Sequence, residues 1–143
     1  MSYSKILIAV DSSEFSMRAA KKGIQLAHQI GAKVALLFVI DLSKAIGNID
    51  AGILPEQALL VLKKEAEQTL DDLAVMYNGE EILKFMPEGH PTKDILKTAE
   101  IWGADLLVIG THGRTGLLHL LVGSTAEYIV RHSKIPVMVV PSK

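Results

Sequence analysis

The chain has 143 residues, of which 49% are hydrophobic and 22% are charged, a composition that fits one globular domain and excludes a disordered or collagen-like protein. Fifteen lysines and arginines against sixteen acidic residues give a formal net charge of −1, which disfavours a general nucleic-acid binder. The absence of cysteine excludes disulfides, thiolate metal sites and cysteine nucleophiles.

Apolar runs and amphipathic segments alternate from the N-terminus onward. The run Ile6–Val10 has no polar alternation, which is typical of a strand covered on both faces. Ser12 and Ser13 then offer N-caps for a helix that ends at Gly31. A second buried strand is expected over Val34–Ile40.

The middle of the chain contains a loop, a long helix and a weaker strand. The segment Asp41–Leu54 reads as a loop, and Pro55 suits the first turn of a helix that ends at Asn78-Gly79. The run Ile82–Met86 includes a lysine and meets a proline, so we expect a strand at the edge of the sheet.

The last part of the chain repeats the alternation. A helix from His90-Pro91 to Gly103 precedes the strand Leu106–Ile109. A loop then leads to a helix opened by Ser124 and Glu127, whose Ser-x-x-Glu spacing predicts a capping box. The last strand is expected over 135–140.

Strands that alternate with helices indicate right-handed crossovers and a parallel sheet. We therefore expect residues 1–143 to form one doubly wound, Rossmann-like α/β domain with helices on both faces. Ligands of such sheets bind beyond the carboxyl ends of the strands. The candidate site must then come from Asp11, the end of the second strand at Val39–Asp41, Gly89–His90 and the loop after Ile109.

Glycines cluster in that last loop with the spacing G-x2-G-x9-G-[ST], which is formed by Gly110, Gly113, Gly123 and Ser124. Glycines allow backbone N–H groups to approach a phosphate chain, and a helix N-terminus adds further donors and a partial positive charge. Ser124 and Thr125 add hydroxyl donors, and Arg114 adds a cation. Each glycine taken alone could simply make a turn, but the whole pattern at a strand-to-helix junction favours phosphate binding.

Three further residues have two open interpretations each. Asp11 could accept ribose hydroxyls or help to hold Mg²⁺, or it could cap the following helix. Val39 could face an adenine ring or belong to the core. His112 could contact phosphate when protonated, although local packing is the simpler role. Neither a Walker loop nor a G-x-G-x-x-G turn after the first strand is present.

The chain resembles the universal stress protein family over essentially its whole length. The resemblance rests on five segments: Lys5–Ser13, Gly89–Pro91, Ala104–Gly113, Gly123–Ala126 and Pro136–Pro141. The complete G-x2-G-x9-G-[ST] spacing is the mark of the ATP-binding branch of that family.

The resemblance implies a five-stranded parallel sheet of order 3-2-1-4-5 and a homodimer built by the last strand, with Val137 and Val139 at the interface. It also implies ATP with Mg²⁺ as cofactor. The nucleotide would be held by Ala9, Val10, Asp11, Val39, Gly110, His112, Gly113, Gly123, Ser124 and Thr125.

Three functions follow as hypotheses. The first is a nucleotide-binding regulatory protein of the stress response, and the second is a slow ATPase or phosphotransferase. The third is a dimeric interaction module without a nucleotide-driven function. We expect binding rather than turnover, because no pair of residues in the sequence resembles a nucleophile and its base, and no His-Glu-x-x-His spacing indicates a zinc hydrolase.

No apolar stretch reaches the roughly 18 residues of a membrane span, and the first apolar run is too short for a signal peptide, so a cytoplasmic protein without a membrane partner is expected.

Overall fold

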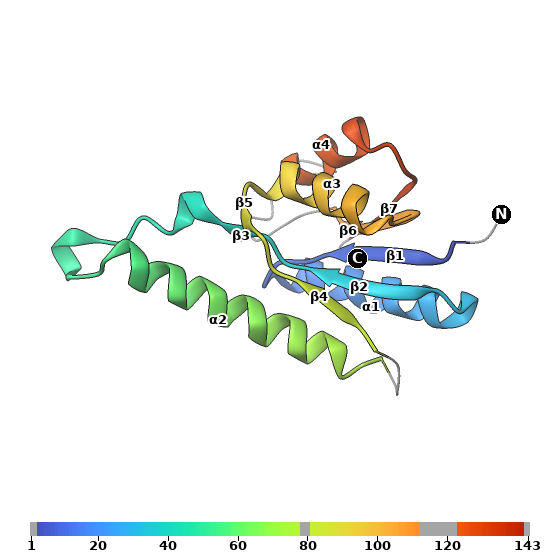
Figure 1. Cartoon of the computed structure of the whole chain (residues 1–143), viewed down its shortest axis with the longest axis horizontal. Helices are drawn as coiled ribbons and strands as arrows, with labels where there is room; N and C mark the ends of the chain where they lie inside the picture. Colours follow the sequence, from blue (N-terminus) through green and yellow to red (C-terminus); the bar gives the residue numbers. More distant parts are fainter. Residues whose placement is uncertain (1–2, 78–80, 112–122, 142–143) are drawn as a thin grey trace.

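Five parallel strands form the central sheet of the computed structural model, which describes residues 3–77, 81–111 and 123–141 (Figure 1). Their order across the sheet is β4-β2-β1-β6-β7, and every neighbouring pair is parallel. In chain numbering this is the expected order 3-2-1-4-5, with the weak third strand at one edge and the last strand at the other. The strands are β1 (Lys5–Ala9), β2 (Lys33–Leu37), β4 (Leu83–Phe85), β6 (Leu106–Gly110) and β7 (Val137–Val140).

Two layers of helices cover the sheet, one on each face (Figure 1). The helices α1 (Glu14–Ile30) and α2 (Pro55–Ala74) lie on one face, and α3 (Pro91–Trp102) and α4 (Ser124–His132) lie on the other. Side chains of β1 alternate between the two cores, with Ile6 and Ile8 in one and Leu7 and Ala9 in the other. Burial on both faces explains why the strand has no polar alternation.

Three helix ends follow the sequence signals, and one helix start does not. Ser13 caps α1 by accepting the N–H of Ser16, and α1 and α3 end at Gly31 and Gly103, whose φ angles are 70° and 80°. The capping box expected at Ser124 is wrong: Gly123 is the N-cap of α4, no side chain caps it, and Ser124 is the first helical residue. The predicted helix end at Asn78-Gly79 lies outside the described residues.

The second predicted strand breaks into two pieces, and the third is one residue shorter at each end than expected. Beyond Leu37 the chain continues beside the segment that contains β4: Phe38 N–H donates to Phe85 and Ile40 N–H donates to Pro87. The result is a separate two-stranded sheet of β3 (Ile40–Asp41) and β5 (Glu88–Gly89) beyond the end of β2. The prediction of one strand over Val34–Ile40 is therefore wrong at its end.

The segment expected to be a loop contains two 3-10 turns, η1 (Leu42–Lys44) and η2 (Ile49–Ala51). The Asp41 side chain caps η1 through Ser43 N–H at 3.0 Å, and the Asn48 side chain caps η2. Because η1 follows β3 directly, it holds Lys44 close to the carboxyl edge of the sheet.

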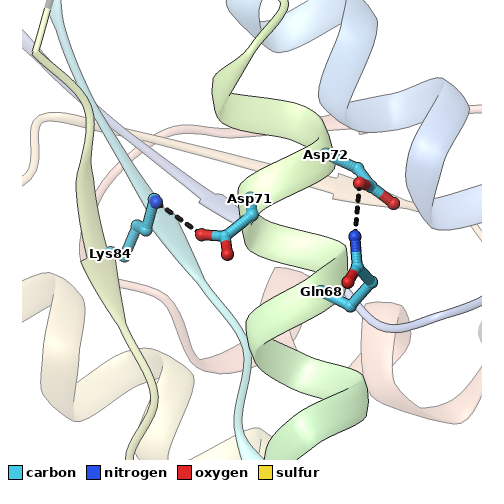
Figure 2. Close-up of polar contacts among 4 residues, drawn as sticks. All are labelled: Gln68, Asp71, Asp72 and Lys84. Atoms are coloured by element: carbon cyan, nitrogen blue, oxygen red, sulfur yellow. Dashed lines mark hydrogen bonds and ion pairs between the residues drawn. The ribbon is translucent and has the colours of Figure 1, made fainter.

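An exposed ion pair connects the edge strand β4 to helix α2. Lys84 Nζ lies 2.6 Å from Asp71 Oδ1, and one turn away Gln68 donates to Asp72 at 2.8 Å (Figure 2). Lys84, which led us to expect an edge strand, therefore forms an ion pair with helix α2. In the described parts of the chain, no helix is both long and apolar enough to cross a membrane.

Candidate functional site

The strand order reverses between β1 and β6, and a cavity of about 250 Å³ opens there over the carboxyl ends of the strands. The carboxyl ends of strands β1, β2 and β6 line this cavity together with the first turn of α4. Eight residues singled out from the sequence meet there: Ala9, Val10, Asp11, Val39, Gly110, Gly123, Ser124 and Thr125. His112, Gly113 and Arg114 lie outside the described residues, and the binding role of the whole set stays a prediction.

Two hydrogen bonds hold Asp11 in place just beyond the carboxyl end of β1. Its backbone N–H donates to Ser16 Oγ at 2.6 Å, and its carboxylate oxygen Oδ1 accepts the N–H of Ser13 at 2.8 Å. The residue that caps α1 is Ser13, so Asp11 supports the turn before the helix rather than serving as its N-cap. Asp11 is one of the residues that line the cavity.

Val39 presents its backbone to the cavity because its neighbours bond in the opposite direction. The N–H groups of Phe38 and Ile40 donate to Phe85 and Pro87, on the β4 side of β2. Backbone groups alternate in direction along an extended chain, so those of Val39 are directed toward β1. Within the described residues no hydrogen bond to the N–H or C=O of Val39 is formed, although the residue is only 9% exposed.

The N-terminus of α4 forms the opposite wall. Ser124 and Thr125 are the first two helical residues, and their N–H groups, like that of Ala126, have no acceptor within the helix by position. These donors and the partial positive charge of the helix end make this wall suited to an anion. Both residues are exposed and line the cavity, so their hydroxyls are available as two further donors.

A backbone hydrogen bond joins the ends of β6 and α4. The N–H of Gly123 donates to the carbonyl of Thr111, and Thr111 N–H donates in turn to Val140 at 3.1 Å. Two residues from separate elements are thereby fixed next to one another at the carboxyl edge of the sheet. This contact also explains the wrong capping prediction, because it holds Gly123 in the extended conformation that an N-cap requires.

Several lining residues were not singled out from the sequence, among them Ser16, Lys44, Leu62, Glu65 and Thr111. Thr111 follows Gly110 directly, so its position within the glycine motif could have predicted that it lines the site. The other four come from α1, η1 and α2, and their approach depends on tertiary contacts that carry no local pattern.

Carboxylates outnumber cations among the described charged residues that line the cavity. Asp11, Asp41 and Glu65 face one ammonium group, that of Lys44. A polyanionic ligand would therefore bind better together with a divalent cation. No cluster of three or more metal-ligating side chains occurs in the described residues. Mg²⁺ needs no such cluster when one carboxylate and phosphate oxygens hold it.

Comparisons with known proteins agree on one family. The sequence model of the universal stress protein family matches residues 2–141. Universal stress protein MJ0531 of Methanocaldococcus jannaschii is 38% identical over 140 residues, which cover 96% of this chain and 82% of that protein.

Solved structures give the same result for the fold. The structure of MJ0577, a universal stress protein of the same archaeon, superposes with a TM-score of 0.86 at 29% identity and covers 100% of this chain and 99% of its own. A universal stress protein solved in complex with cAMP gives a TM-score of 0.70 at 24% identity, with both chains covered completely.

Proposed function

Because the chain belongs to the universal stress protein family, we propose that it binds ATP with Mg²⁺ and acts as a nucleotide-dependent regulatory protein of the cytoplasmic stress response. One observation carries the proposal. The backbone of Val39, the carboxylate of Asp11 and the N-terminus of α4 line a single cavity at the switch point of the sheet.

Val39 supplies the recognition of the base. One N–H donor and one C=O acceptor on the same residue match the ring nitrogen and the amino group of adenine. Guanine offers a carbonyl and a ring N–H at the corresponding positions, so its groups would meet the wrong partners. The relative solved with cAMP also holds an adenine nucleotide, but at 24% identity it shows the fold alone. The assignment of adenine to this chain therefore rests on Val39.

The N-terminus of α4 supplies the recognition of the phosphates. Ser124 and Thr125 offer backbone and hydroxyl donors, and the spacing of Gly110, Gly113 and Gly123 supports close approach of a phosphate chain. By their place in this motif, His112 and Arg114 are assigned to the same phosphates.

Asp11 is assigned two contacts at the centre of the cavity. Its carboxylate, positioned by Ser13 N–H, accepts the ribose hydroxyls and is the protein ligand of Mg²⁺. When bound, the metal ion neutralises phosphate charge that the carboxylates of the cavity would otherwise repel.

In this proposal the nucleotide is retained rather than turned over. Hydrolysis needs a positioned water, a base or orienting group, and stabilisation of the charge on the transferred phosphoryl group. No pair of residues in the sequence resembles a nucleophile and its base. The nucleotide then serves as a signal that biases the conformation of the protein or its choice of partner.

The strand β7 is proposed to form a homodimer. Its neighbour β6 bonds to Pro136 and Val140, since Leu107 N–H donates to Pro136 at 3.0 Å and Thr111 N–H donates to Val140. The period of two along a strand directs the backbone groups of Val137 and Val139 away from β6. An open edge of this kind invites pairing with the same strand of a second copy.

Calorimetric titration with ATP, GTP and adenosine tests the nucleotide site. We expect ATP to bind at least about tenfold more tightly than GTP, because one backbone pair distinguishes the two bases. Gly113→Val combined with Gly123→Val should weaken ATP binding by about a hundredfold and adenosine binding much less, since added side chains obstruct only the phosphate wall. Adenosine is the internal control for folding. Unchanged ATP affinity in the double variant would refute the phosphate assignment.

Incubation with a stoichiometric amount of ATP separates the binder from the enzyme. We expect the bound nucleotide to remain largely ATP over hours, as measured by chromatography of the released ligand. Multiple turnovers that are lost in Asp11→Ala would instead support the ATPase.

A further inference from the structure

A second cavity of about 500 Å³ lies between α1 and the residues that follow α2. It is lined by one stripe of α1, in which Arg18, Lys22, Gln25 and Gln29 recur at steps of three and four residues. Met76 and Tyr77 close its other side. No described residue lines both this cavity and the first one. We refer to this second cavity as the basic groove.

Among the described residues, the charged side chains of the basic groove carry one sign. Arg18, Lys21 and Lys22 line it together with His28, and no carboxylate of the described part of the chain does. The chain as a whole has a net charge of −1, so this stripe concentrates positive charge on an otherwise balanced protein. Lys21 and Lys22 are exposed and make no ion pair within the described residues. The groove therefore attracts anionic groups.

The floor of the basic groove is apolar and held in place. Ile24 and Tyr77 are 5% and 6% exposed, and Met76 beside them is 41% exposed. The hydroxyl of Tyr77 donates to the carbonyl of Ala32 at 3.1 Å, and its ring meets the His28 ring edge-on with centroids 6.4 Å apart. A rigid apolar floor under a cationic rim suits a ligand that carries both carboxylates and apolar groups.

We propose that the basic groove binds an acidic peptide segment of a partner protein, one that alternates carboxylate and apolar side chains. Side chains on alternate sides of an extended peptide would place carboxylates against Lys21 and Lys22 and apolar groups on Met76. The amides of Gln25 and Gln29 can pair with the peptide backbone. From Arg18 to Gln29 the helix rises about 16 Å, which matches about five extended residues.

A peptide explains the groove better than a small polyphosphate does. A polyphosphate would use the ammonium groups but would leave the exposed part of Met76 and the floor beneath it unused. The combination of charge and apolar surface is therefore what identifies the ligand class.

Fluorescence anisotropy with a labelled peptide of about ten alternating glutamate and leucine residues tests the proposal, the length being about twice the span of the groove. We expect saturable binding that Lys21→Glu with Lys22→Glu weakens by about tenfold or more, because two favourable contacts become repulsive. The matched control is Lys93→Glu with Lys97→Glu on α3. It changes the net charge equally at two lysines outside the groove, and it should change the affinity less than about twofold.

Met76→Gln tests the apolar part without altering the charge. We expect this substitution to lower the affinity for the peptide by about threefold and to leave the affinity for a peptide with serine in place of leucine unchanged. Circular dichroism of each variant verifies the fold. The proposal is overturned by absence of saturable binding, by equal losses in both double-lysine variants, or by tripolyphosphate displacing the peptide while Met76→Gln has no effect. The last result would identify a site for small anions instead.

Discussion

The hydroxyl of Ser16 accepts a hydrogen bond from the backbone N–H of Asp11 at 2.6 Å, so the first turn of α1 holds the end of β1 in place. Ser16 is 5% exposed, and Ser13 caps the same turn by accepting the N–H of Ser16. The carboxylate of Asp11 therefore owes its position to a helix that contributes little else to the cavity. Affinity for a nucleotide should depend on this contact.

Ser16→Ala should lower both stability and ATP affinity. The substitution leaves the half-buried N–H of Asp11 without its partner, which costs about 1–2 kcal/mol of folding free energy. ATP affinity should fall severalfold because Asp11 is less well positioned. Urea unfolding and calorimetry measure the two effects.

Tyr77→Phe is the matched control for Ser16→Ala. It removes one buried hydrogen bond, to Ala32, and neither residue lines the cavity. We expect a similar loss of stability with ATP affinity unchanged. If both variants lowered the affinity equally, the positioning role of Ser16 would be wrong.

The sheet could be predicted from the sequence because its strands are buried on both faces. Ile6 and Leu7 point into different cores and both are fully buried, so an unbroken apolar run is the direct consequence of the fold. The edge position of β4 was equally visible, since Lys84 can remain in solvent only there. Glycines at Gly31 and Gly103 marked helix ends through a local requirement for positive φ.

Features that depend on distant segments could not be predicted. After Leu37 the second strand gives way to β3, where Ile40 bonds to Pro87, a residue far away in sequence. The N-cap of α4 is Gly123 rather than Ser124 because Thr111 holds the N–H of that glycine. In the site, Lys44 and Glu65 reach the cavity only through the 3-10 turn and the placement of α2. Local sequence patterns do not predict such tertiary contacts.

Asp105 joins the start of β1 to the start of β6 and should make stability dependent on acid. Its carboxylate accepts the N–H of Ser4 at 2.9 Å, the N–H of Lys5 at 3.1 Å and the hydroxyl of Ser4. Partial burial acts to raise the pKa of Asp105, but these hydrogen bonds together outweigh it and hold the pKa below its ordinary value. The folded state therefore favours the ionised carboxylate.

Asp105→Asn should destabilise the protein by about 1 kcal/mol at neutral pH, because charge-assisted hydrogen bonds are replaced by weaker ones. The advantage of the wild type should be complete above the pKa of an unfolded aspartate, about 3.9, and should shrink as the pH falls toward the lower pKa of the folded state. Urea unfolding at neutral and at acid pH measures this. Ser4→Ala, which removes one donor, should show a smaller loss at neutral pH. A difference between wild type and Asp105→Asn that grows in acid contradicts the assignment.

The pair Lys84–Asp71 should contribute little to stability despite its short distance. The two side chains are 39% and 62% exposed, so solvent screens their attraction. A double-mutant cycle with Lys84→Met and Asp71→Asn should give a coupling free energy of about 0.2–1 kcal/mol that nearly vanishes in molar salt. The longer pair Lys63–Glu88, at 3.6 Å, should give less still. A coupling above about 2 kcal/mol, or one that salt does not change, would show that the surface is less screened than its exposure indicates.

The proposed dimer depends on the backbone of β7 more than on its side chains. Val137 and Val139 are half-buried against the core under α3 and α4, so charged substitutions there would disturb folding as well as association. Val139→Pro is a sharper test, because it removes an N–H directed away from β6 and leaves the bonds to Pro136 and Val140 in place. Edge strands accept proline where the N–H points outward.

Sedimentation equilibrium should show a dimer for the wild type that Val139→Pro weakens by at least about tenfold, since pairing of two antiparallel edges loses a hydrogen bond in each copy. Val139→Ala keeps the N–H while trimming the side chain, and it should weaken the dimer much less even if it costs about as much stability. A monomeric wild type at micromolar concentration, or equal weakening by proline and alanine, would place any interface elsewhere. Because the cavity is built within one chain, ATP affinity should be the same in Val139→Pro and in the wild type.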